Sequence, residues 1–191
     1  MVVDPAVSRR KFDRDVAEVL ERRDYFMQRG AWIVSTDFPE VFVVLGTPKT
    51  KPHFVPYAVL FDFTDYDVQP LSVRLVNPFT KQRLKSTEIA YPFYRANPPP
   101  PGFPPGTQAG AQPMLQVFSD DAPFLCLPGI RDYHASSAHT GDSWWLHRRT
   151  GAGKLFNLLD NLCKYGTEPI SSIQATTQIV LGQFVGAGVP Q

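Results

Sequence analysis

Hydrophobic positions near the start of the chain recur at helical spacing. Apolar side chains fall three or four residues apart from Phe12 to Phe26, which is the period of one face of an α-helix. Charged residues fill the other positions, as expected for a face open to solvent. Ser8 fits the amino-terminal cap and Gly30 fits the stop, so the pattern predicts one helix over residues 8–29.

Four short apolar runs, rich in β-branched and aromatic residues, follow this helix. Turn-forming residues separate them, with Asp37 and Pro39 in the first interval. Such runs predict strands. The four expected strands are Trp32–Thr36, Val41–Leu45, Tyr57–Phe63 and Leu71–Val76. A helix followed by consecutive strands indicates an α+β domain with a four-stranded antiparallel meander.

Proline dominates the middle of the chain. There are 19 prolines, about twice the usual share, and they crowd between about residues 92 and 113. Because proline fits neither helix interiors nor central strands, we expect an irregular insertion there. Met114–Phe118 reads as one more extended piece, and Lys154–Tyr165 returns to helical spacing. We expect a single domain over residues 1–191, with a poorly defined tail from about residue 168.

Charge and composition exclude some classes of binding partner. With 19 basic against 18 acidic residues the net charge is +1, so the chain lacks the positive field that grips nucleic acids. Trp144 and Trp145 are accordingly expected in the core.

Two cysteines, Cys126 and Cys163, form no disulfide framework and indicate a reducing compartment. The apolar runs are too short to span a membrane and no signal pattern opens the chain. We therefore expect a cytoplasmic protein with no nucleic-acid or membrane partner.

The chemistry-bearing residues gather between Cys126 and His147. This stretch holds three of the four histidines, one of the two cysteines and two of the three tryptophans. In a first interpretation Cys126 is a nucleophile, because a partly exposed thiol attacks as the thiolate and Pro128-Gly129 keeps the chain in a loop after it. In the alternative, Cys126 is a buried small hydrophobe, as cysteines often are.

A second interpretation makes the same stretch a metal site. Thiolate, imidazole and carboxylate are suitable ligands for zinc, and Cys126, His134 and His139 together with Asp132 or Asp142 could supply them. Seven residues separate the cysteine from the first histidine and four separate the two histidines. These are not the tight paired spacings of structural zinc sites. Each histidine could equally be a hydrogen-bonded loop residue.

The order of elements and three local motifs resemble the ubiquitin-conjugating enzyme family. FTDYDVQPLSV, from Phe63, resembles the family's crossing from the third to the fourth strand. FLCL, around Cys126, resembles the segment that carries its thioester cysteine. Trp144 and the helix that follows resemble the family's downstream tryptophan and helix. The resemblance spans about residues 8–165 and implies a ubiquitin-conjugating-like α+β fold.

The chain also departs from the family pattern. The His-Pro-Asn motif before the cysteine is missing, since Asn77-Pro78 lies some fifty residues upstream of Cys126, and Leu71 replaces the second proline of the crossing. The interval from the cysteine to Trp144 is stretched. Such divergence resembles bacterial conjugation systems, which combine a ubiquitin-like protein, an activating enzyme, a conjugating-type protein and a JAB-type peptidase.

The resemblance implies a function and an alternative. If Cys126 is free and exposed, the protein is a ubiquitin-like protein transferase that carries its modifier as a thioester without a cofactor. His134, His139 or a backbone N–H would then stabilise the oxyanion. Its partners would be the ubiquitin-like protein, an activating-type enzyme and a JAB-type peptidase. The same gene neighbourhoods include predicted metal-binding proteins with a cysteine, an acidic residue and two histidines, which implies a non-catalytic zinc scaffold through Cys126, Asp132, His134 and His139. A peptide-binding module built on the proline-rich segment is a third possibility.

Overall fold

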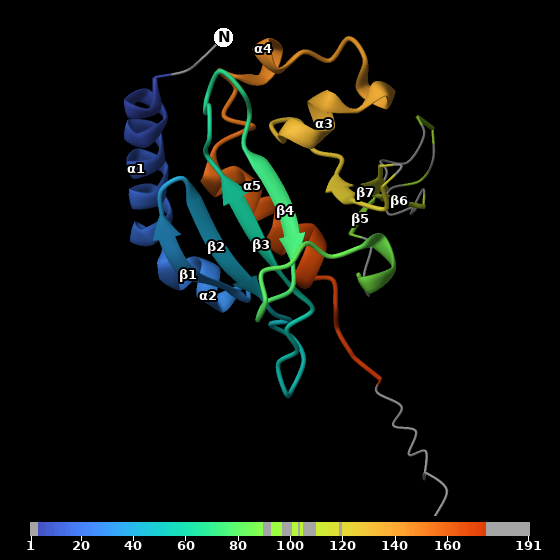
Figure 1. Ribbon diagram of the computed structural model, residues 1–191. Helices are drawn as coiled ribbons and strands as arrows, with labels where there is room; N and C mark the ends of the chain where they lie inside the picture. Colours follow the sequence, from blue (N-terminus) through green and yellow to red (C-terminus); the bar gives the residue numbers. More distant parts are fainter. Residues whose placement is uncertain are drawn as a thin grey trace, which may run out of the picture.

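The protein is an α+β structure with a four-stranded antiparallel sheet, as the sequence predicts (Figure 1). The computed structural model describes residues 4–89, 93–96, 101–102, 104, 110–118 and 120–174. The sheet has the order β1 (Ala31–Asp37), β2 (Glu40–Leu45), β3 (Tyr57–Asp62) and β4 (Ser72–Val76). All four predicted strands are therefore confirmed within one or two residues.

Helices and short strands surround this sheet. The helices are α1 (Pro5–Glu21), α2 (Arg23–Gln28), α3 (Arg131–Ala135), α4 (Trp144–His147) and α5 (Leu155–Leu162). The short strands are β5 (Tyr94–Ala96), β6 (Ala111–Pro113), β7 (Leu115–Val117) and β8 (Pro123–Leu125). Single turns are η1 (Ser86–Glu88), η2 (Ser137–His139) and the π-helical η3 (Cys163–Thr167).

The first helix differs from its prediction at both ends. It begins at Pro5, because the side chain of Asp4 accepts a hydrogen bond from Ala6 N at 2.9 Å and a proline suits the first turn. Ser8, the expected cap, lies inside the helix, where its buried hydroxyl donates to Tyr66 O at 2.7 Å. The helix then breaks at Arg22, so the expected single element is two.

The core lies between one face of the sheet and the helices α1 and α5. In β3, Tyr57, Val59 and Phe61 are fully buried and face this core, as expected for alternate positions of a strand. Figure 1 shows α5 crossing behind the sheet with α1 beside it. Burial of each large apolar side chain contributes about 1.5–3 kcal/mol to the stability of the fold. This layer therefore fixes the position of the sheet, and with it β8 and α3, which contact the edge strand β4.

The proline-rich segment carries a short ladder that the sequence did not predict. β5 pairs antiparallel with β6, from Tyr94↔Pro113 to Ala96↔Ala111. Pro113 is tolerated because it ends a short exposed strand. Most of the residues between these strands lie outside the described part of the chain, as do residues 175–191 of the expected tail. No helix in the described ranges is long and apolar enough to cross a membrane.

The hairpin β7–β8 places Cys126 beside the edge strand β4. The ladder continues past β8, where Cys126 N donates to Met114 O at 2.7 Å. The chain then turns and returns to the main sheet, because Ile130 bridges to Leu71 and Arg131 N donates to Leu71 O at 2.8 Å. A segment that precedes β4 therefore anchors the chain just after the cysteine.

Candidate functional site

Cys126 is a free thiol at the end of β8, half-buried rather than enclosed in the core. Its Sγ lies 3.1 Å from His139 Nε2, and the side-chain amide of Gln116 donates to it at 3.5 Å. Burial raises the pKa of the Cys126 thiol, although the nearby positive charge of Arg95 acts in the opposite direction. Because the thiol starts protonated at neutral pH, it needs a base to become a nucleophile, and His139 contacts it directly.

A ring stack holds the imidazole of His139 in place. The phenol ring of Tyr133 lies parallel to it, with 3.9 Å between ring centroids and 22° between planes. Tyr133 OH in turn donates to Asp142 Oδ2 at 2.6 Å. Burial, and then this hydrogen bond, raise the pKa of Tyr133 to about 12, so the phenol remains a donor throughout the physiological range.

Asp142 joins the other parts of the histidine loop, which we define as residues 131–147. Its Oδ1 accepts from His147 Nε2 at 2.5 Å, and its backbone N donates to His139 O at 3.1 Å. The hydrogen bonds from Tyr133 and from His147 lower the pKa of the Asp142 carboxyl. The carboxylate is thus ionised at neutral pH and connects the Tyr133–His139 stack to α4.

His134 occupies a different place from the one expected. Its Nε2 accepts the backbone N–H of Gly129 at 3.2 Å, and its Nδ1 pairs with Asp142 O at 2.8 Å. Because Nε2 accepts an N–H and Nδ1 faces a carbonyl oxygen, this hydrogen-bond pattern places a ring proton on Nδ1. His134 therefore joins two loops, while His139 is the histidine that contacts the sulfur.

The four groups expected to hold zinc are not gathered around one point. The structure brings Cys126 and His139 together, but the hydrogen bonds above occupy both ring nitrogens of His134. Asp132 lies on α3, with its Oδ2 buried and without a hydrogen-bond partner among the described residues. Within the described ranges, no three His, Cys, Asp or Glu side chains are placed to hold a metal ion. As placed, these residues do not fit a zinc centre.

The two tryptophans have different environments. Trp144 is buried, as predicted, and its Nε1 donates to Asp67 O at 2.9 Å. Trp145 is 58 % exposed, so its expected place in the core is wrong. It helps to line an open pocket of about 300 Å³ at the histidine loop, to which Arg131 and His134 also contribute. Adjacent residues on a helix point in different directions, and here only Trp144 points into the core.

Asp67 connects the histidine loop to the first helix. Its carboxylate forms an ion pair with Lys11 of α1 and another with Arg148, which follows α4, at 3.0 Å. Burial alone would raise the pKa of Asp67, but the hydrogen bonds from Arg148 and Lys11 outweigh it and the pKa is lowered. Together with the Trp144 bond, these contacts fix α4 against the start of the chain.

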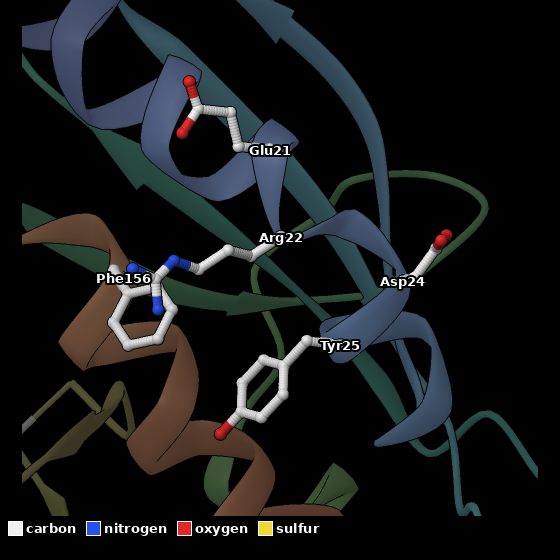
Figure 2. A pocket seen from close by; sticks show the side chains of 5 residues that line it. All are labelled: Glu21, Arg22, Asp24, Tyr25 and Phe156. Carbon is white, nitrogen blue, oxygen red and sulfur yellow. The ribbon is translucent and has the colours of Figure 1, made fainter.

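A larger hollow, of about 460 Å³, is lined by residues of α1, α2 and α5 and by Arg22 between the first two helices (Figure 2). The figure shows the Arg22 side chain reaching over the ring of Phe156, with the guanidinium 5.0 Å from its centroid. Tyr25 lies next to them and its hydroxyl donates to Asp160 at 2.7 Å. These contacts join α2 to α5. The lining holds no cysteine or histidine, so we assign this hollow no chemistry.

The sequence did not single out Gln116 or Tyr133. Gln116 reaches the sulfur only through the pairing of β7 with β8, and Tyr133 reaches His139 only through the reversal between α3 and η2. The available signal was their position: Gln116 is a polar residue inside a predicted extended piece, and Tyr133 is an aromatic residue directly before a candidate histidine.

Comparison with known proteins identifies the family of the chain. The model of the Y4jH-like family, described as "Y4jH family", matches residues 3–170. The chain is also 38% identical over 189 residues to "Uncharacterized protein y4jH" of Sinorhizobium fredii (strain NBRC 101917 / NGR234), an alignment that covers 94% of this chain and 92% of the relative. Neither description names an activity. The chain belongs to the Y4jH-like family.

Proposed function

We propose that this protein is a conjugating-type acyl carrier in a bacterial ubiquitin-like pathway, with Cys126 as the carrier residue. Cys126 would take the C-terminal acyl group of a ubiquitin-like protein from an activating-type enzyme and pass it to an amine. The observation that carries the proposal is the 3.1 Å contact between Cys126 Sγ and His139 Nε2 at the half-buried end of a hairpin. The resemblance of the FLCL and Trp144 segments to ubiquitin-conjugating enzymes supports this choice of substrate.

The first step is a thioester exchange. Cys126 Sγ attacks the carbonyl carbon of the activated modifier while its proton passes to Nε2 of His139. When the tetrahedral intermediate collapses, the bond from that carbon to the sulfur of the activating enzyme breaks. The departing thiolate recovers the proton from His139, so the base is regenerated and no cofactor is needed.

The second step transfers the acyl group to an amine. The amine nitrogen attacks the thioester carbonyl and gives up one proton to His139. The carbon–sulfur bond then breaks, and Cys126 Sγ leaves as a thiolate that takes this proton back. A JAB-type peptidase would reverse such a linkage in the same pathway.

The second cysteine provides a contrast within the same chain. Cys163 is completely buried at the end of α5, and burial raises its pKa to about 12. A thiol in that environment is chemically inert. The half-buried Cys126 with an adjacent imidazole therefore remains as the reactive sulfur.

The test replaces Cys126 by serine. The purified protein is mixed with ATP and with the ubiquitin-like protein and activating-type enzyme from the same genome. Wild type should give an adduct that a thiol reductant cleaves, and Cys126→Ser should give an ester that resists the reductant. Cys163→Ala is the matched control and should behave as wild type does. Normal conjugation by Cys126→Ser, or an adduct on another residue, would overturn the proposal.

A further inference from the structure

Gln116 and Cys126 share one face of the β7–β8 hairpin. The register pairs Leu115 with Leu125, and the next pair in the ladder is Met114 with Cys126. Residues two apart on a strand point to the same side, so Gln116 is the diagonal neighbour of Cys126. Diagonal neighbours are within reach of a long side chain, and the Gln116 amide does extend to Sγ, at 3.5 Å.

Cys126 and the three residues that follow it offer no free backbone donor. Cys126 N donates to Met114 O at 2.7 Å, and Leu127 N donates to Leu125 O at 2.9 Å. Pro128 has no N–H, and Gly129 N donates to His134 Nε2 at 3.2 Å. At each of the four positions from 126 to 129, the backbone N–H is therefore either already hydrogen-bonded or absent.

The two histidines nearby are committed in the same way, and Arg95 is a separate, cationic neighbour of the thiol. His139 faces the sulfur with the nitrogen that must accept the thiol proton, and His134 uses both of its ring nitrogens elsewhere. The Gln116 amide, in contrast, donates only to sulfur among the described residues. Sulfur is a weak acceptor, so this donor can transfer to a stronger one at little cost.

We propose that the side-chain amide of Gln116 is the catalytic donor that stabilises the tetrahedral oxyanion formed on Cys126. This inference rests on the proposed acyl-carrier function. When Sγ bonds to a carbonyl carbon, the carbonyl oxygen gains a negative charge two bonds from the sulfur, within the reach of an amide that already contacts Sγ. The N–H then moves from Sγ to the oxyanion, and it returns when the carbon–sulfur bond of the leaving group breaks.

The energetics favour this assignment. A hydrogen bond that is stronger in the transition state than in the ground state accelerates the reaction. The Gln116 amide meets a weak sulfur acceptor before attack and a charged oxygen during it. Removal of one such donor typically slows acyl transfer by about 100- to 1000-fold.

The experiment compares two reactions of the same thiol. The full-length protein reacts either with a small peptide thioester ending in Gly-Gly, which passes through an oxyanion, or with iodoacetamide, which does not. Gln116→Met keeps the length of the side chain and removes the donor, while Gln28→Met makes the same change at an exposed position of α2. Mass spectrometry of intact protein gives both rates.

We expect Gln116→Met to slow thioester exchange by about 100-fold and to leave alkylation of Cys126 unchanged. Gln28→Met should match wild type in both reactions, and continued protection of Cys163 reports that each variant is folded. Equal slowing of both reactions by Gln116→Met, or no slowing of exchange, would overturn the oxyanion role alone. If wild type alkylates at Cys126 but does not exchange with the thioester, the acyl-carrier function itself fails.

Discussion

Replacement of Gly129 by alanine is expected to disrupt the turn that presents Cys126. Gly129 has φ +97°, a conformation that L side chains rarely adopt. A Cβ at this position would also lie 2.6 Å from backbone atoms of Ala152 and Gly153, which cannot move aside as a flexible side chain could. Gly141, in the histidine loop, has the similar φ of +96° but meets nothing within 4 Å, so Gly141→Ala is a matched control.

The magnitudes follow from these two contributions. The positive φ costs about 1–2 kcal/mol at either position, and overpacking against backbone adds about 1–3 kcal/mol at Gly129 only. We therefore expect Gly129→Ala to lose about 2–5 kcal/mol of unfolding free energy and Gly141→Ala about 1–2 kcal/mol. Urea titration measures both, and an unchanged slope with denaturant would show that only the native state is affected.

The same variant tests how the turn holds the site. Gly129 N is the donor to His134 Nε2, so displacement of the turn should also slow thioester exchange at Cys126, while Gly141→Ala leaves it less affected. Equal losses of stability for Gly129→Ala and Gly141→Ala would refute the reasoning, because backbone strain alone would then account for both.

Four further outcomes follow from the site. Iodoacetamide should modify Cys126 and not the buried Cys163 of the folded protein; peptide mapping that finds equal labelling would contradict this. Hydrogen bonds from Tyr133 and then from a histidine lower the pKa of Asp142, so its stabilisation is present above the unfolded pKa and is lost as pH falls through the folded one. The difference in unfolding free energy between wild type and Asp142→Asn should therefore shrink only below about pH 4, and urea titrations that show shrinkage already near neutral pH would disagree. Tyr133→Phe keeps the ring on His139 and should slow thioester exchange less than Tyr133→Ala, whereas equal rates would exclude a positioning role for the stack. Dialysis against a chelator should leave the alkylation rate of Cys126 unchanged, and release of one equivalent of zinc would instead favour the scaffold alternative.

The sheet was predictable because its residues carry a local signal. β3 is a continuous apolar run buried at nearly every position, and turn residues bound it on both sides. The start of α1 was missed for an equally local reason, since Asp4-Pro5 and Ser8 are both plausible amino-terminal signals. The hydroxyl of Ser8 instead donates a hydrogen bond to the backbone of Tyr66, and no local sequence pattern predicts this long-range contact.

The site could be predicted only in part. Cys126 and His139 were named as candidates, but their contact depends on a chain reversal through two short helical turns that carry no hydrophobic period. The partnership of Gln116 with Cys126 depends on hairpin register, which the separation of the two residues along the chain does not reveal. Long-range pairing of this kind is set by the whole fold rather than by neighbouring residues.

The attachment of Asp67 has a consequence for how the protein is made. Its partner Lys11 precedes it by 56 residues, whereas Trp144 and Arg148 follow it by 77 and 81 residues, so Lys11 leaves the ribosome first. Until α4 has been synthesised, Asp67 can pair with Lys11 alone among these three partners. A nascent chain stalled before that point therefore lacks the contacts that fix α4, and the histidine loop beside Cys126 is not yet held against α1.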